Sequence, residues 1–185
     1  MRFLRDAAIT VVVLVLIAVV AAVLVARRGL AADQEPGRLE RTIAGPMWHG
    51  PALGEVLEGV SAEQAAARPI PGAHSIWELV LHITVWAGIA LERLRGRALD
   101  DPPSSKDWQT PSTTTAEAWA QATEHLGAAY RALAREVASL DAEALAAEIP
   151  TRGYSAATML RGVVEHGTYH GGQIAILKRA LESRH

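Results

Sequence analysis

Two histidines, His166 and His170, stand four residues apart in the stretch "GVVEHGTYHGGQIAILKR", which otherwise has the apolar spacing of a buried helix face. Side chains at positions i and i+4 lie one above the other on a helix, so both imidazoles can reach the same point. Imidazole nitrogens bind divalent metals, but a core histidine with hydrogen-bonded nitrogens has the same appearance in a sequence. A third nitrogen ligand would favour the metal.

His82 is the candidate for this third ligand. It lies on the apolar stripe of a second helical stretch, between Leu79 and Trp86. Each buried and unsatisfied ring nitrogen would cost about 1 to 3 kcal/mol, whereas a shared divalent ion satisfies one nitrogen of each ring. We therefore expect His82, His166 and His170 to bind one ion. Three protein ligands leave a position open, as in reactive metal sites.

The histidine pair is not the HExxH motif of zinc peptidases. Position 167 is Gly instead of the glutamate base, and Glu165 projects about 100° away from His166 on a helix. Glu78 precedes His82 by four residues, but its spacing from Ser75 is that of a capping box. The sequence therefore offers no obvious general base near the three histidines.

The elements that carry these residues are expected to be helices. Capping boxes precede the second and third helices, and the third carries apolar residues in alternating steps of three and four. A polar, Pro-rich segment over residues 96–113 is long enough to cross the length of a bundle, so the helices on either side of it should run parallel. No strand pattern is present, which predicts an all-α fold. The four expected helices cover about residues 50–60, 75–95, 114–140 and 155–182.

The N-terminal stretch "AAITVVVLVLIAVVAAVLVA" has no charged residue over residues 7–26, and a helix of that length rises about 30 Å, the thickness of the hydrocarbon core of a bilayer. This pattern predicts a single-pass transmembrane helix, with a cleaved signal peptide as the alternative. The arginines after it favour a cytoplasmic C-terminal domain over an extracytoplasmic one. Translation from Met47 would remove the segment altogether.

These features divide the chain into a membrane anchor at 1–28, a linker at 29–46 and a bundle domain at 47–185. The linker is expected from the Gly, Pro and mixed charge of "GLAADQEPGR". The net charge of -2 and the lack of a basic patch argue against nucleic-acid binding. The short "RLRGR" at 93–97 is expected to place cations at a helix C-terminus. The chain has no cysteine, which excludes disulfides and thiolate ligands.

"HSIWELVLHI" and "EHGTYHGGQIAILK" together closely resemble the DinB-like (YfiT-like) superfamily of metal-binding four-helix bundles. The resemblance covers about residues 47–181, including "MWHGPAL" and the Asp107-Trp108 pair. It implies a bundle in up-down-down-up order with a long crossover between helices two and three, and the ligands His82, His166 and His170. The family is known to include metal-dependent thiol transferases and hydrolases.

Other polar residues are weaker candidates. Gln173 shares the face of the two histidines and could orient a substrate or a water, and His49 could line the mouth of a pocket. His74 precedes the Ser75 cap and is expected to be exposed. The pair Gly171-Gly172 predicts close approach by another helix, with space for a ligand as the alternative.

Two functions remain open. A metal-dependent enzyme would activate a thiol cosubstrate or water for a thiol S-transferase or hydrolase reaction, and a non-catalytic, membrane-tethered bundle would bind metal or ligand as a sensor. Zinc or nickel is favoured as the divalent ion, with iron or manganese as alternatives. The expected partners are a small-molecule substrate, which includes a low-molecular-weight thiol, and the membrane. A homodimer stays open as the oligomeric state.

Overall fold

A computed structural model describes residues 13–21 and 35–183 of the chain, and these residues are helices and connecting loops with two isolated bridges, Met47 to Gly50 and Glu148 to Ser155. Residues 13–21 are helical. The labelled helices are α2 (Glu35–Ala44), α3 (Leu53–Leu57), α4 (Ala62–Ala66), α5 (Ile76–Leu94), α6 (Ser104–Asp107), α7 (Ala116–Ala138), α8 (Ala142–Ala146) and α9 (Ala156–Glu182).

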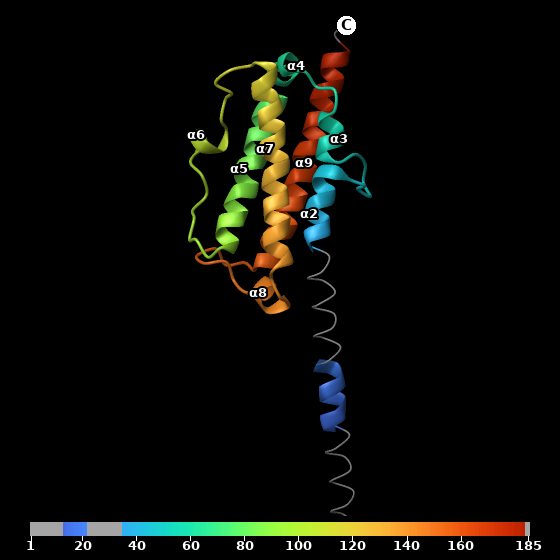
Figure 1. Ribbon diagram of the computed structural model, residues 1–185, viewed down its shortest axis with the longest axis vertical. Helices are drawn as coiled ribbons and strands as arrows, with labels where there is room; N and C mark the ends of the chain where they lie inside the picture. Colours follow the sequence, from blue (N-terminus) through green and yellow to red (C-terminus); the bar gives the residue numbers. More distant parts are fainter. Residues whose placement is uncertain (1–12, 22–34, 184–185) are drawn as a thin grey trace, which may run out of the picture.

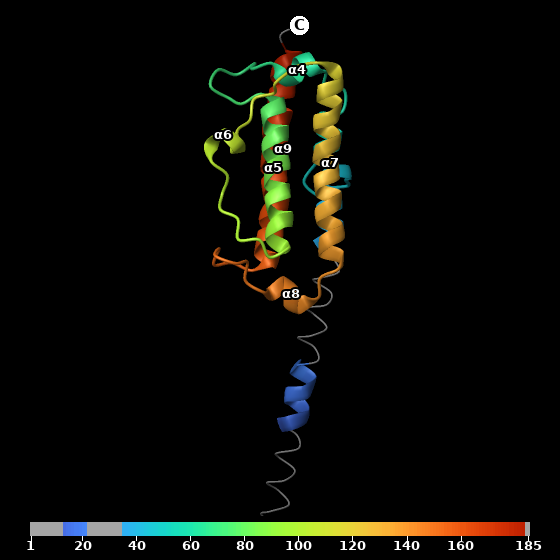
Figure 2. The same cartoon turned by 60° about the vertical axis from the view of Figure 1, so that its left-hand side comes forward.

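Helices α5, α7 and α9 and the pair α2–α3 pack side by side along one axis (Figures 1 and 2). The colours of Figure 1 show that α2 and α9 run toward the end of the molecule that carries the C-terminus, while α5 and α7 run away from it. The segment between α5 and α7, which contains α6, returns along the outside of the bundle. It is this return that makes α5 and α7 parallel.

Side-chain caps begin most of the helices at the expected places. Ser75 accepts from the backbone N–H of Glu78 at 3.2 Å, and the Glu78 carboxylate accepts from the backbone N–H of Ser75 at 2.8 Å. This capping box fixes the first turn of α5 and with it the register of His82. Ser155 caps α9 with a single hydrogen bond, which its side chain accepts from the backbone N–H of Thr158, and α7 begins one residue later than expected, with Thr115 as its cap.

Helix α2 lies within residues 29–46, where the sequence predicted a linker. Its buried side chains Leu39 and Thr42 face the bundle, and the helix contacts both α7 and α9. Gly45, at φ 69°, and Pro46 then interrupt the helix before α3 begins, because neither residue supports a continuous α-helix there. The first bundle element is therefore two short helices instead of one, and the packed unit begins before residue 47.

The prediction of a transmembrane helix with single-pass membrane localisation is corrected. Within residues 13–21 and 35–183, no helix combines the length and the apolar character needed to cross a bilayer. Of the predicted span 7–26, the structure describes only residues 13–21, which are helical. The rest of that span lies outside the described residues.

The core is apolar and continuous from α2 to α9. Its few buried donors have acceptors: Trp119 Nε1 donates to the Val60 carbonyl at 2.8 Å, and Tyr130 Oη donates to the Val163 carbonyl at 3.3 Å. Six polar or charged residues of the described chain are also buried, namely Thr42, Ser75, Glu78, His82, Arg93 and His170. Two of them belong to the histidine cluster, and Arg93 lines the pocket beside it.

Candidate metal centre

Three imidazoles from two helices meet in the bundle. Helix α5 supplies His82, and α9 supplies His166 and His170 one turn apart. The Nε2 atom of His166 lies 3.0 Å from Nε2 of His82 and 3.1 Å from Nε2 of His170. His82 and His170 are each 5% exposed, and His166 is half-buried. The expected three-histidine cluster therefore forms, and these residues could hold a metal ion.

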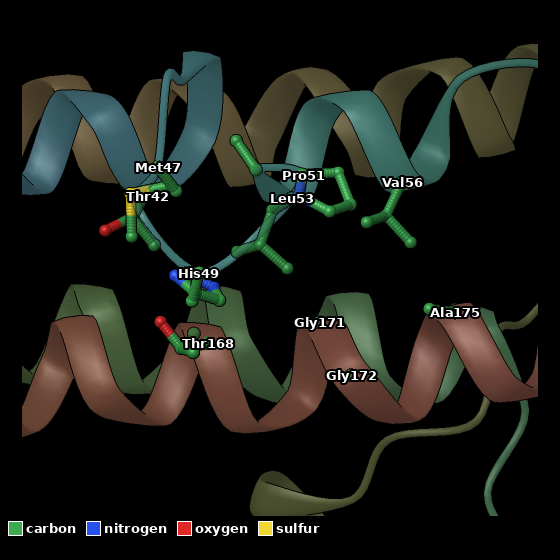
Figure 3. A pocket seen from close by; sticks show the side chains of 12 residues that line it. Thr42, Met47, His49, Pro51, Leu53, Val56, Thr168, Gly171, Gly172 and Ala175 are labelled. Atoms are coloured by element: carbon green, nitrogen blue, oxygen red, sulfur yellow. The ribbon is translucent and has the colours of Figure 1, made fainter.

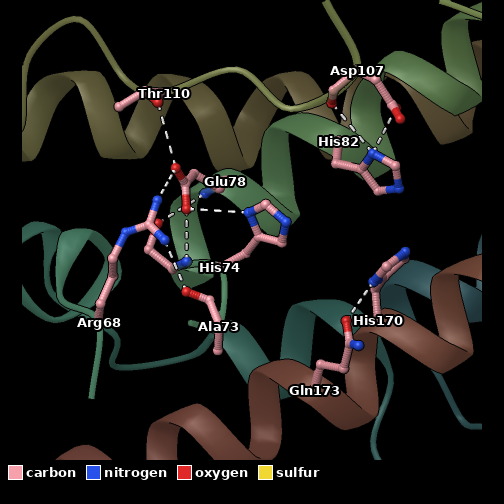
Figure 4. A network of polar contacts seen from close by, with 10 residues as sticks. Arg68, Ala73, His74, Glu78, His82, Asp107, Thr110, His170 and Gln173 are labelled. Atoms are coloured by element: carbon pink, nitrogen blue, oxygen red, sulfur yellow. Dashed lines mark hydrogen bonds and ion pairs between the residues drawn. The ribbon is translucent and has the colours of Figure 1, made fainter. Parts of the chain in front are cut away.

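The outer nitrogens of two of these rings face oxygen acceptors (Figure 4). His82 Nδ1 lies 2.8 Å from Asp107 Oδ1 and 3.2 Å from the Asp107 carbonyl oxygen. His170 Nδ1 lies 2.6 Å from Gln173 Oε1. A nitrogen that faces acceptors carries the proton, so both rings are Nδ1–H tautomers with a lone pair on Nε2. The lone pairs point into the cluster.

The number of protons does not match the number of close contacts at the centre. His82 Nε2 and His170 Nε2 are both acceptors, and His166 Nε2 is within 3.1 Å of each of them. A neutral His166 has at most one proton on Nε2 and donates it to one neighbour only. The other contact then brings two lone pairs together. One cation shared by the three Nε2 atoms removes this conflict.

The spacing also suits a small divalent ion. Nitrogens that bind one tetrahedral ion at about 2.0–2.1 Å lie about 3.3 Å from one another. The two distances from His166 Nε2 to the other Nε2 atoms, 3.0 and 3.1 Å, are within a few tenths of an ångström of that value. Small rotations of the rings are enough to admit the ion.

Burial favours the neutral form of two of these imidazoles, His166 and His170, as metal binding requires. Desolvation, with smaller contributions from the neighbouring rings of His170 and His82, lowers the pKa of His166 to about 4. Burial also lowers the pKa of His170, although its hydrogen bond to Gln173 acts in the opposite direction. At neutral pH the lone pairs are available and protons do not compete for them.

The stability of the metal-free protein should therefore depend on pH. An unfolded chain protonates His166 near pH 6.5, whereas the folded chain resists protonation down to about pH 4. Between these values the unfolded state binds more protons, so the free energy of unfolding falls as the pH is lowered from about 6.5 to about 4. Urea unfolding with chelator present measures this slope. The His166→Leu variant should have a smaller slope, and an unchanged slope would contradict the assignment.

Asp107 is a site residue that the sequence analysis did not assign. Besides its two contacts with His82, its Oδ1 accepts a hydrogen bond from Trp86 Nε1 at 2.8 Å. It ends α6 in the crossing segment, which brings a carboxylate to the cluster where none was expected. The next residue, Trp108, stacks between the rings of His82 and His74, with centroid distances of 3.8 and 3.7 Å. The crossing segment thus holds His82 through both polar and aromatic contacts.

Replacing Asp107 with Asn should weaken metal binding. The Asp107 charge favours the Nδ1–H tautomer of His82 and makes its Nε2 more basic, and the variant removes this charge. Hydrogen-bond partners of this kind are worth about 10- to 100-fold in metal affinity. Titration with a chromophoric chelator competitor measures the change. Asp100→Asn is the matched control because Asp100 lies in the same crossing segment with its side chain fully exposed. Equal affinities of the two variants would contradict the role given to Asp107.

A pocket of about 510 Å³ opens beside the cluster between α5 and α9. The three histidines and Asp107 line one end, and Trp86, Ala90, Met159 and Val163 line the middle. Tyr169 is 64% exposed, stands edge-on to His170 and lines this pocket. The open side of the centre therefore faces a space large enough for a small molecule.

The weaker candidates take different places. Gln173 holds His170 through its amide oxygen. His49 is exposed and lines a separate pocket of about 180 Å³, whose walls share no residue with the histidine pocket (Figure 3). His74 is not simply exposed: its ring stacks on Trp108, and its Nδ1 lies 3.6 Å from Glu78 Oε2. The structure thus brings Gln173 to the three histidines and leaves His49 apart from them.

Glu78 belongs to the cap and not to the metal centre. Its carboxylate accepts from the backbone N–H of Ser75 and forms an ion pair with Arg68 (Figure 4). Burial raises the pKa of Glu78, but the Ser75 hydrogen bonds and the charges of Arg68 and His74 together lower it by more than burial raises it. The net shift is downward. The carboxylate stays ionised and committed to the start of α5, as the capping-box spacing predicted.

The fold and the site define a class of protein, an all-α bundle with three converging histidines that could hold a metal ion. The family model of the DinB superfamily matches residues 47–174, which is more than half of the chain. The chain therefore belongs to the DinB superfamily, as its motifs indicated. Comparison with curated proteins and with solved structures gave no match.

Proposed function

We propose that this protein is a metal-dependent enzyme that activates a thiol cosubstrate at the three-histidine centre. The observation that carries the proposal is the pair of acceptor nitrogens, His82 Nε2 and His170 Nε2, held toward His166 Nε2 by Asp107 and Gln173. This donor set suits a divalent ion with three protein ligands and an open position. The three histidines line the pocket, so a molecule bound there could reach the open position.

A bound divalent ion would lower the pKa of a thiol or a water at the open position, which makes the thiolate or hydroxide available at neutral pH. The residues of the chain favour the thiol. Asp107 is the one carboxylate among the described residues that line the pocket. Its Oδ1 already contacts His82 Nδ1 and accepts from Trp86 Nε1, so it is not free to act as a general base. A hydrolase would gain from a free general base, whereas a metal-activated thiol needs none.

The nucleophile would arrive with the cosubstrate, because the chain has no cysteine of its own. In the transfer step, the thiolate sulfur would form a bond to an electrophilic carbon, and the leaving group would depart with the electron pair of the broken bond. The imidazoles of His82, His166 and His170 would remain neutral throughout. Their role is to hold the centre, and the roles of Asp107 and Gln173 are to fix the tautomers and orientations of the rings.

The test uses the full-length protein loaded in turn with Zn²⁺, Ni²⁺, Fe²⁺ or Mn²⁺. Thiol transfer is followed with low-molecular-weight thiols and an activated aryl chloride, which releases chloride as the sulfur–carbon bond forms. We expect turnover that requires both the thiol and the metal. Ester hydrolysis without a thiol would favour water as the nucleophile. Metal binding that raises only the melting temperature, with no turnover, would contradict an enzymatic role and support the non-catalytic binding protein.

A further inference from the structure

The pocket beside the histidines has a second polar end, built around a buried arginine. Arg93 is 3% exposed and lines the pocket from the last turn of α5. Its Nε and Nη2 donate to the Leu99 carbonyl, Nη2 also donates to Asp101 Oδ1, and Nη1 donates to Tyr154 Oη at 3.2 Å. A guanidinium has five N–H groups. Four are thus used among the described residues, and one N–H on Nη1 is left.

The charge of this arginine is only partly matched. Asp101 pairs with Arg93 at 2.8 Å and also with Arg152, so one carboxylate serves two guanidiniums. Asp100 is fully exposed and reaches Arg152 at 3.9 Å only. Arg152 is mostly covered, with 17% of its side chain exposed. Among the described residues that line this end of the pocket, Arg93 is the charged one, because Asp100 and Asp101 do not line the pocket.

Two hydroxyl groups line the same end. The Tyr154 oxygen accepts from Arg93 Nη1 at 3.2 Å. A hydroxyl that accepts one hydrogen bond still has its own proton to donate to another group. Thr158, one turn into α9, adds the second hydroxyl to the lining. Arg93, Tyr154 and Thr158 form what we call the arginine end of the pocket.

The space between the two ends is apolar and short. Trp86 stands between them, with its ring 6.0 Å from Arg93 Cζ and its centroid 6.2 Å from that of His166. Ala90, Met159 and Val163 complete the walls. Arg93 Cζ and the His166 ring are therefore no more than about 12 Å apart. An apolar wall with a few convergent polar groups at each end is typical of a small-molecule site.

We propose that the arginine end binds the carboxylate of the substrate, so that the molecules taken by this site are small acids with an apolar segment between the carboxylate and the reacting atom. This inference rests on the proposed function only where it assumes that the other end of the ligand reacts at the three histidines. The carboxylate accepts from the remaining Nη1–H of Arg93 and from the Tyr154 hydroxyl, and the apolar middle of the ligand packs against Trp86. Charge-assisted hydrogen bonds of this kind give selectivity for an acid over its amide.

The experiment compares hydrocinnamate with hydrocinnamide, which differ only in the charge at one end. Binding to the full-length protein is measured by calorimetry, first with chelator present and then with Zn²⁺. Tyr154→Phe removes the donor hydroxyl and keeps the ring. Tyr169→Phe is the matched control because it makes the same change at the histidine end of the same pocket. Circular dichroism of each variant establishes that it is folded.

We expect the acid to bind at least about tenfold more tightly than the amide, which corresponds to a charge-assisted hydrogen bond of about 1.4 kcal/mol or more. Tyr154→Phe, in which Arg93 keeps its charge, should lower this ratio several-fold, and Tyr169→Phe should keep it. Equal binding of acid and amide, no binding of either, or an acid preference that is the same in Tyr154→Phe as in the native protein would overturn the inference. An acid preference in the metal-free protein combined with a failure to bind metal would sink the proposed function alone.

Discussion

The full-length His166→Ala variant is expected to bind divalent metal at least about 100-fold more weakly than the native protein. His166 Nε2 lies within 3.1 Å of both other Nε2 atoms, so it is the common member of the cluster. Its loss leaves two nitrogen ligands for an ion that needs at least three from the protein in sites of this kind. Competition with a chromophoric chelator measures the affinity, and elemental analysis after dialysis measures the ion retained.

His125→Ala provides the control for this variant. His125 is an exposed histidine of α7 and has no part in the cluster. Its loss should leave the affinity and the retained metal unchanged. If both variants lost metal to the same degree, the ion would be bound nonspecifically through surface histidines. If neither did, the ligand set would lie elsewhere.

The second large effect is expected at Gly167, next to the ligand. A Cβ at this position would lie 2.6 Å from Tyr130 Oη and 2.8 Å from Thr42 Cγ2, and both neighbours are buried. Tyr130 also donates to the Val163 carbonyl on the same helix, so it has little freedom to move away. Overpacking of this kind costs about 1–3 kcal/mol. Gly167→Ala should therefore lower the free energy of unfolding by about 2 kcal/mol, as urea unfolding would measure.

Gly172→Ala is the matched comparison on the same helix. A Cβ at Gly172 would meet no atom within 4 Å, whereas one at Gly171 would lie 3.3 Å from Leu53 Cδ2. In open space the better helix propensity of alanine stabilises by up to about 1 kcal/mol. Opposite signs for Gly167→Ala and Gly172→Ala are therefore expected. A loss of stability in both would mean that the helix backbone, and not the contact with Tyr130, requires glycine.

The positions of the three histidines could be predicted because they depend on periodicity. Each one falls on the apolar stripe of a long helix with a recognisable cap, and a stripe of that kind has to face the core. The pair Gly171-Gly172 was a partly useful signal, since Gly171 does pack against Leu53 in α3. The tightest glycine contact is at Gly167, which no spacing rule distinguished from its neighbours.

The contribution of Asp107 could not be predicted from periodicity. It lies in the segment between α5 and α7, and where a crossing segment touches a bundle depends on the packing of the whole fold. The adjacent Trp108 was the available signal, because a tryptophan in a polar, Pro-rich segment has to bury its ring somewhere. Its ring stacks on His82.

Arg93 and α2 were misjudged for the same physical reason. A cation near a helix C-terminus and a short charged helix are both typical of protein surfaces, so the sequence indicates exposure. Both are buried here by partners that are distant in the sequence. Arg93 is buried because Leu99, Asp101 and Tyr154 surround its guanidinium. Helix α2 is packed because it contacts both α7 and α9, and its Leu39 is fully buried.

The central claim is that one divalent ion binds at the meeting point of three Nε2 atoms. X-ray absorption spectroscopy of the full-length protein, reconstituted with one equivalent of Zn²⁺, tests it most directly. We predict one tightly bound ion per chain with three imidazole nitrogens at about 2.0–2.1 Å and a further ligand that is not from the protein. A spectrum with fewer than three imidazoles, or one that is the same in the His166→Ala variant, would contradict the claim.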